Sequence, residues 1–117
     1  MMHYQQGDVV SVLFPFTDLS NAKLRPALVI SNSLVANTGD LIIVMITSKE
    51  RDDGINLEIN SGDINFALPR KSFVRCHRIA TIDENIVDRK FATVTKEFIA
   101  KVLASVKILI EAMENQK

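Results

Sequence analysis

Side chains of the types that handle phosphate stand beside or inside apolar stretches of this 117-residue chain, and they are Arg25, Thr47, Ser48, Arg75 and His77. An arginine can direct two N–H donors at phosphate oxygens, and a hydroxyl can donate to a third oxygen. Cleavage of RNA needs a base for the 2′-hydroxyl proton, an acid for the leaving 5′-oxygen and donors for the developing charge. Because the 2′-hydroxyl is the nucleophile, neither a metal nor a covalent residue is required. The residue types therefore suit cleavage of a phosphodiester.

The same residues also have plainer interpretations. Arg25 before a proline fits a solvated strand edge, and Thr47-Ser48 after an apolar strand fits turn chemistry. Arg75 and His77 fit the outer face of a half-buried strand. Residue types alone leave both interpretations open.

Motifs for other chemistry are missing from the sequence. His3 and His77 lie far apart, and Cys76 is the single cysteine, which we interpret as a small core residue. There is no G-x-x-x-x-G-K-[ST] loop, no G-x-S-x-G elbow and no G-x-G-x-x-G, and the chain has only four glycines. We therefore expect no metal and no cofactor.

Composition indicates one domain over residues 1–117, with 47% hydrophobic residues to build a core. The charge is balanced at 14 basic and 14 acidic residues, so any nucleic-acid contact must be local. Residues 1–7 show no apolar signal region, no apolar run approaches the roughly 20 residues of a membrane span, and the lone cysteine fits a reducing compartment. We expect a cytoplasmic protein without membrane contact.

The elements that must position these side chains are mostly strands. Apolar runs predict strands near residues 9–14, 27–31, 41–46, 55–59, 72–82 and 91–94, and turn-forming or charged segments predict connections at 16–21, 31–40 and 49–54. The run 41–46 is apolar throughout, which indicates burial on both faces.

Two further patterns bear on the fold. Phe73 and Arg75 should share one face of their strand, and His77 should join them if the strand is regular. From Thr95, a plausible N-cap, apolar residues recur at helical spacing for roughly 18 residues and need a sheet to cover. Strands followed by one helix predict a mainly β protein, a small curled sheet or open barrel with one packed helix.

The order of several motifs resembles the MazF/PemK/Kid toxin family. G-D-V-V at residues 7–10 is followed by F-P-F-T-D at 14–18, R-P-A-L-V-I-S at 25–31 and I-T-S at 46–48. R-C-H-R-I-A-T-I-D at residues 75–83 is similar to the family stretch R-C-D-x-x-R-T-I-D. The resemblance extends from Gly7 to about Met113.

The resemblance implies an SH3-like barrel of the CcdB/MazF type. It also implies a homodimer with an RNA groove across its two-fold axis, and a cognate antitoxin whose disordered segment blocks that groove. The implied activity is metal-independent cleavage of single-stranded RNA at short sequences, which leaves a 2′,3′-cyclic phosphate and a 5′-hydroxyl.

Family catalytic positions correspond by motif to Arg25, Thr47 and Arg75. His77 stands where the family has an acid, and a histidine can itself move protons near neutral pH. The substrate contacts that we expect beside these catalytic residues are Ser48, Lys49, Lys71 and Phe73.

Two other functions stay open at the level of sequence. A gyrase-inhibiting toxin similar to CcdB would act through its terminal helix and would not need Arg25 or Thr47. A non-catalytic barrel that binds RNA or an antitoxin would bind without cleaving. The R-P-A-L-V-I-S string and Thr47 favour the nuclease.

Overall fold

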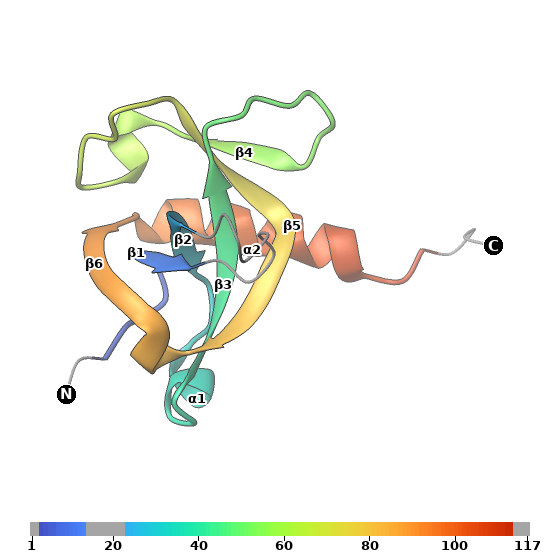
Figure 1. The fold of residues 1–117 in the computed structure, drawn as a ribbon. Coiled ribbons are helices and arrows are strands. Elements are labelled where there is room, and N and C mark those ends of the chain that lie inside the picture. The colour runs from blue at the N-terminus through green and yellow to red at the C-terminus, as the bar shows by residue number, and fades with distance from the viewer. Residues whose placement is uncertain (1–2, 14–22, 114–117) are drawn as a thin grey trace.

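A computed structural model describes residues 3–13 and 23–113 (Figure 1). The predicted loop at 16–21 lies outside the described residues. In chain order the elements are β1 (Asp8–Leu13), β2 (Leu24–Val29), α1 (Ser33–Ala36), β3 (Asp40–Thr47), β4 (Asn56–Ile59), the 3-10 helix η2 (Ser61–Asp63), β5 (Ser72–Asp83), the 3-10 helix η3 (Glu84–Ile86), β6 (Val87–Thr93) and α2 (Lys96–Ile110).

The six strands form one antiparallel sheet in the order β4-β5-β3-β2-β1-β6. Its two edges meet through the segment that follows β4. Ile64 forms a β-bridge with Val94, and the Thr95 N–H donates to the Asp63 carbonyl at 2.8 Å. The sheet is therefore closed into a small barrel, which confirms the predicted fold of the CcdB/MazF type.

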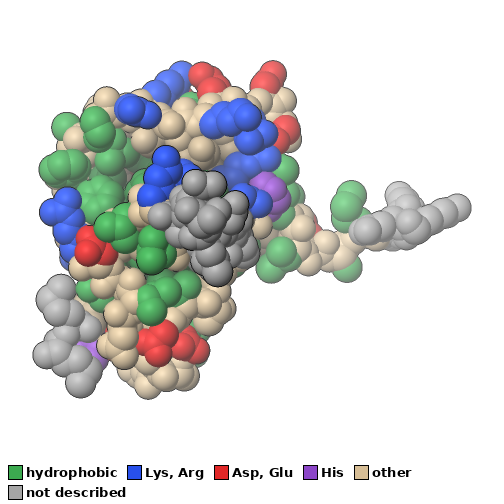
Figure 2. Space-filling model, viewed as in Figure 1, with side chains coloured by type: hydrophobic (Ala, Val, Ile, Leu, Met, Phe, Trp, Pro, Cys, Tyr) green, Lys and Arg blue, Asp and Glu red, His purple; other side chains and the backbone are tan. Residues whose placement is uncertain are grey.

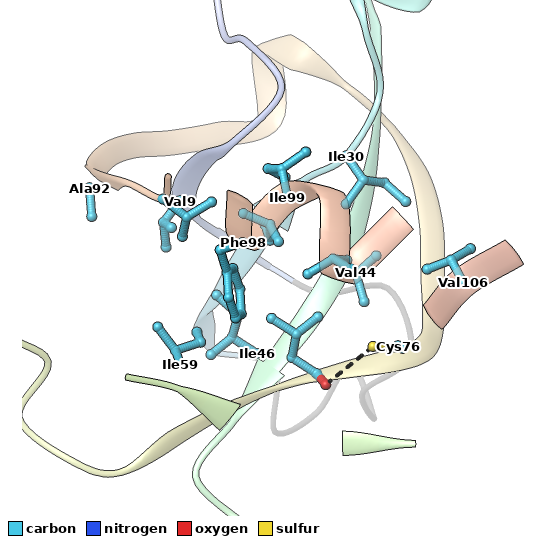
Figure 3. Close-up of a cluster of buried hydrophobic side chains, with 14 residues drawn as sticks. Val9, Ile30, Val44, Ile46, Ile59, Cys76, Ala92, Phe98, Ile99 and Val106 are labelled. Atoms are coloured by element: carbon cyan, nitrogen blue, oxygen red, sulfur yellow. Dashed lines mark hydrogen bonds between the residues drawn. The ribbon is translucent and has the colours of Figure 1, made fainter. Parts of the chain in front are cut away.

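The core has two parts, and β3 contributes to both. Val44 and Ile46 join the larger cluster beneath α2, which includes Phe98 (Figure 3). Leu41 and Ile43 join the second cluster, with side chains of β1 and β2. The central strand is thus buried on both faces, as its unbroken apolar run predicted.

The terminal helix begins where the sequence predicted. The Thr95 hydroxyl oxygen accepts a hydrogen bond from the Phe98 N–H at 3.1 Å. The predicted length of about 18 residues was wrong, because α2 has 15. Its second half runs past β5 and away from the barrel (Figure 1), so that Leu109 and Ile110 are 40% and 73% exposed. The sheet therefore covers only the first part of the apolar face.

The strand around Pro26 begins earlier than predicted, at Leu24, so Arg25 belongs to β2. Pairing of β2 with β3 starts only at Ala27, while Pro26 pairs with Ser11 of β1. With a neighbour on one side only, the missing N–H of Pro26 is tolerated.

Three smaller differences complete the comparison. The predicted connection at 31–40 contains the short helix α1, β4 starts at Asn56, and β6 is longer than predicted because it starts at Val87. Among the described residues, no helix is both long and apolar enough to span a membrane.

Candidate functional site

The larger hollow on the barrel surface, here called the main groove, has a volume of about 690 Å³. Strands β1, β2, β3 and β6 and the segments after β3 and before β5 build its walls. The lining residues are Val9, Ser11, Leu24, Arg25, Pro26, Met45, Ile46, Thr47, Ser48, Phe66, Leu68, Pro69, Arg70, Ser72, Arg89, Lys90 and Phe91.

A smaller hollow, here called the side pocket, has a volume of about 280 Å³ and is lined by Met45, Thr47, Arg51, Arg75, His77 and Arg78. Met45 and Thr47 line both hollows. Figure 2 shows that Lys and Arg side chains gather on the face of the barrel that it presents. None of the described residues lining either hollow is acidic, so both hollows suit an anion.

Register places Arg25 and Thr47 on one wall of the main groove. Ala27 of β2 pairs with Met45 of β3, and Arg25 and Thr47 lie two residues further along these antiparallel strands. The Thr47 hydroxyl oxygen accepts from the Lys49 N–H at 3.1 Å. The turn chemistry anticipated for Thr47 is therefore present, and it leaves the O–H proton of Thr47 available to a ligand.

Arg25 has a donor without a partner. Its Nε is buried and makes no hydrogen bond with any residue that the structure describes. A buried N–H that lacks an acceptor costs free energy, so an acceptor supplied by a ligand would be favourable here.

Arg75 is paired within the chain. Its Nη1 and Nη2 donate to the two carboxylate oxygens of Asp53 at 2.9 and 2.8 Å, and Nη1 also donates to Asn56 at 3.0 Å. This hydrogen-bonded fork lowers the pKa of Asp53 to about 2 and raises the pKa of Arg75. The predicted catalytic Arg75 therefore reaches the side pocket with both of its Nη atoms already engaged.

An irregular stretch of β5 builds the side pocket. Along the β3 side of β5, Val44 pairs with Ile79 and Ile46 pairs with Val74. The four residues 75–78 of β5 therefore lie opposite a single residue of β3, Met45. Such a bulge changes the directions of side chains. It allows Arg78 to line the same pocket as Arg75 and His77.

His77 is exposed, and its pKa is lowered. Partial desolvation of the ring is the largest cause, followed by the positive charges of Arg75 and Arg78. His77 is therefore neutral at pH 7 and can accept a proton.

Three of the predicted substrate contacts line neither hollow. Lys49 is exposed elsewhere, and Lys71 lies 3.5 Å from Glu50 and 4.0 Å from Glu58. Phe73 is 4% exposed and lies under the Lys71 ammonium, 5.7 Å from its ring centroid. A buried ring cannot stack on a substrate, so the structure does not fit the predicted contact of Phe73. The fourth residue, Ser48, does line the main groove.

Sequence reasoning missed several groove residues. Arg70 and Arg89 line the main groove, and Phe66 and Phe91 stand beside them. The signal was present in Arg89-Lys90-Phe91, where basic residues adjoin an aromatic one. Lys90 is less available, because its Nζ lies 3.1 Å from the Asp8 carboxylate.

The chain is thus a small closed β-barrel with one terminal helix, and Thr47 lies between two hollows that arginines line. Comparison with known proteins identifies it further. The family model of PemK-like, MazF-like toxins of type II toxin-antitoxin systems matches residues 5–110, so the chain belongs to this family. The resemblance inferred from the motifs is confirmed.

Solved structures agree with this fold. MazF from Deinococcus radiodurans is 18% identical with a TM-score of 0.76, covering 94% of this chain and 98% of that chain. A mycobacterial endoribonuclease is 20% identical, with a TM-score of 0.72 and coverage of 92% and 91%. A mycobacterial endoribonuclease in complex with its cognate antitoxin is 18% identical, with a TM-score of 0.73 and coverage of 94% and 99%. No curated protein gives a significant match.

Proposed function

We propose that this toxin is a metal-independent endoribonuclease that cuts single-stranded mRNA in the cytoplasm. The observation that carries the proposal is the position of Thr47. Its free O–H stands where the main groove and the side pocket meet, with the unpartnered Nε of Arg25 on one side and His77 on the other. These groups supply a charge-stabilising donor, a hydroxyl donor and a proton acceptor to one phosphodiester.

In the proposed reaction the scissile phosphate lies at Thr47. Neutral His77 takes the proton of the 2′-hydroxyl, whose oxygen attacks phosphorus and forms the cyclic P–O bond. The bond to the 5′-oxygen breaks, and that oxygen takes a proton from a water molecule in the main groove, on the Arg25 side. His77 later returns its proton to solvent. Arg25 and Thr47 donate hydrogen bonds to the negative charge that develops on the phosphate oxygens. The products are a 2′,3′-cyclic phosphate and a 5′-hydroxyl.

We also propose a cognate antitoxin and a homodimer. One mycobacterial relative was solved with its antitoxin, and an acidic segment would suit the arginines of the main groove.

The exposed apolar end of α2, including Ile108 and Ile110, supports contact with a second subunit. Light scattering that found only a 13.1 kDa monomer at micromolar concentration would contradict the dimer.

The test is incubation of the purified protein with a mixed RNA pool in EDTA, followed by mapping of new 5′ ends. We expect cleavage at a short recurrent sequence and 5′-hydroxyl termini. RNA binding without cleavage would instead support the non-catalytic barrel. Inhibition of gyrase in a supercoiling assay, with intact RNA, would support the CcdB-like alternative.

A further inference from the structure

One wall of the main groove carries a pair of aromatic rings. Phe66, from the segment before β5, meets Phe91 of β6 edge to face, with ring centroids 6.0 Å apart and planes at 76°. Phe66 is 49% exposed, whereas the other described phenylalanines are buried, as Phe73 and Phe98 are, or half-buried, as Phe91 is. Packing of the barrel therefore does not account for the position of this ring.

The backbone beside this ring is nevertheless anchored to β6. Asn65, its neighbour, exchanges two hydrogen bonds with Thr93. The Asn65 N–H donates to the Thr93 carbonyl at 3.1 Å, and the Thr93 N–H donates to the Asn65 side-chain oxygen at 2.7 Å. Thr93 and Phe91 belong to the same strand, so the backbone beside Phe66 is tied to the strand that carries Phe91. A ring that is ordered before binding loses little entropy when a ligand stacks on it.

Positive charge surrounds the pair. Arg70 precedes β5, Arg89 lies two residues before Phe91 on β6, and both line the main groove that leads to Arg25. Alternation of cationic and aromatic side chains along one groove is typical of surfaces that bind single-stranded nucleic acid. The cations track the phosphates, and the rings receive the bases.

We propose that Phe66, braced by Phe91, is a stacking platform for one purine base of the RNA, close to the scissile phosphate, and that it contributes to the choice of cleavage sequence. The inference rests on the proposed ribonuclease function. A purine offers the larger π-face, and Arg70 and Arg89 supply donors of the kind that pair with the O6 and N7 acceptors of guanine. The platform gives the groove a preference that phosphate contacts alone cannot give.

The test uses single-stranded 2′-O-methyl oligonucleotides, which cannot be cleaved, with 2-aminopurine at each position in turn. For the wild-type protein we expect fluorescence quenching at one position, because the probe stacks on the ring. Phe66→Leu keeps the apolar volume and removes the aromatic face. It should abolish the quenching and weaken binding about 10-fold, the scale of one lost base–aromatic stack. Phe66→Tyr should retain both.

Ile86→Ala is the matched control, since Ile86 is 51% exposed and lies outside the main groove. It should bind and quench as the wild type does. Equal quenching in wild type, Phe66→Leu and Phe91→Leu, with unchanged affinity, would overturn the platform. Because these oligonucleotides are not substrates, that result is independent of whether the protein cleaves RNA in EDTA. Replacing the probe base with a pyrimidine should weaken binding of the wild type only.

Discussion

Arg25 and Arg75 lie on the two sides of Thr47, and they differ in their hydrogen-bond partners. Arg25, on the main-groove side, has a buried Nε without a partner. Arg75, on the side-pocket side, forks onto the Asp53 carboxylate at 2.9 and 2.8 Å. A phosphate reaching Arg25 satisfies an unused donor, whereas a phosphate reaching Arg75 must compete with a carboxylate already in place.

The sequence motifs predicted a catalytic role for both arginines. In the structure the two guanidinium groups differ in how many of their donors already have hydrogen-bond partners. Arg25 is suited to hold the charge of the reacting phosphate. Arg75 is suited to orient the pocket, and its charge adds to the desolvation that lowers the pKa of His77. The predictions below test this contrast.

The largest effect should follow from removing Arg25, whose Nε has no partner among the described residues. Arg25→Ala should lower kcat/KM for RNA cleavage about 100-fold or more, the scale of one charge-stabilising group. Arg25→Lys should also be impaired, because a point charge does not replace a fork. Lys49→Ala, outside both hollows, is the control and should cut normally. A folded Arg25→Ala variant with the wild-type rate would remove Arg25 from the mechanism.

His77 should come next. If it accepts the proton, its lowered pKa places the acid limb of the kcat/KM profile below pH 6.5, and activity falls as His77 becomes charged. His77→Ala should slow cleavage about 10-fold or more and flatten that limb. His77→Asp, which restores the residue type of the family motif, should keep activity and move the limb toward acid. An alanine variant with an unchanged profile would make His77 a surface residue.

Thr47 should show a smaller loss. Thr47→Val keeps the shape and removes the hydroxyl, so we expect cleavage to fall about 10-fold, since one neutral donor is lost and Ser48 stands nearby. Thr47→Ser should restore the rate. Thermal unfolding must be compared in parallel, because the same oxygen accepts the Lys49 N–H. Equal rates for the valine and serine variants would reduce Thr47 to turn chemistry.

The smallest effect should come from replacing Asp53, the partner of Arg75, and it should be seen in RNA binding and in acid stability. Asp53→Asn removes the charged partner of Arg75, so RNA should bind a few-fold more tightly, with a small loss of stability at pH 7 because the ion pair is partly exposed and screened. The folded pKa of Asp53, about 2, lies below the usual 3.8, so its stabilising contribution is present above pH 3.8 and is lost as pH falls toward 2. Acid titration of unfolding should lose that component in the variant. Weaker RNA binding would contradict the release of Arg75.

Short-range patterns predicted much of this fold. The apolar run at 41–46 and the Thr95 cap depend on neighbours in sequence, and both were confirmed. The side pocket depends instead on a register shift between β3 and β5, which no local pattern encodes. For the same reason the sequence could not show that the Asp53 carboxylate accepts hydrogen bonds from Arg75, or that Phe73 is buried. The roles of the site residues therefore remain predictions for the assays above.

Closure of the barrel has a consequence for its motions. The bonds that join residues 63–65 to the end of β6 also hold the segment that carries Phe66. Local opening of this groove wall thus requires the hydrogen bonds that close the barrel to break. The free energy of opening the wall is therefore the same as the free energy of opening the barrel at this point. Exchange of the amide hydrogens of Thr93 and Thr95 with solvent would report that opening directly. An RNA or antitoxin that binds this groove wall would slow the exchange of the Thr93 and Thr95 amides together.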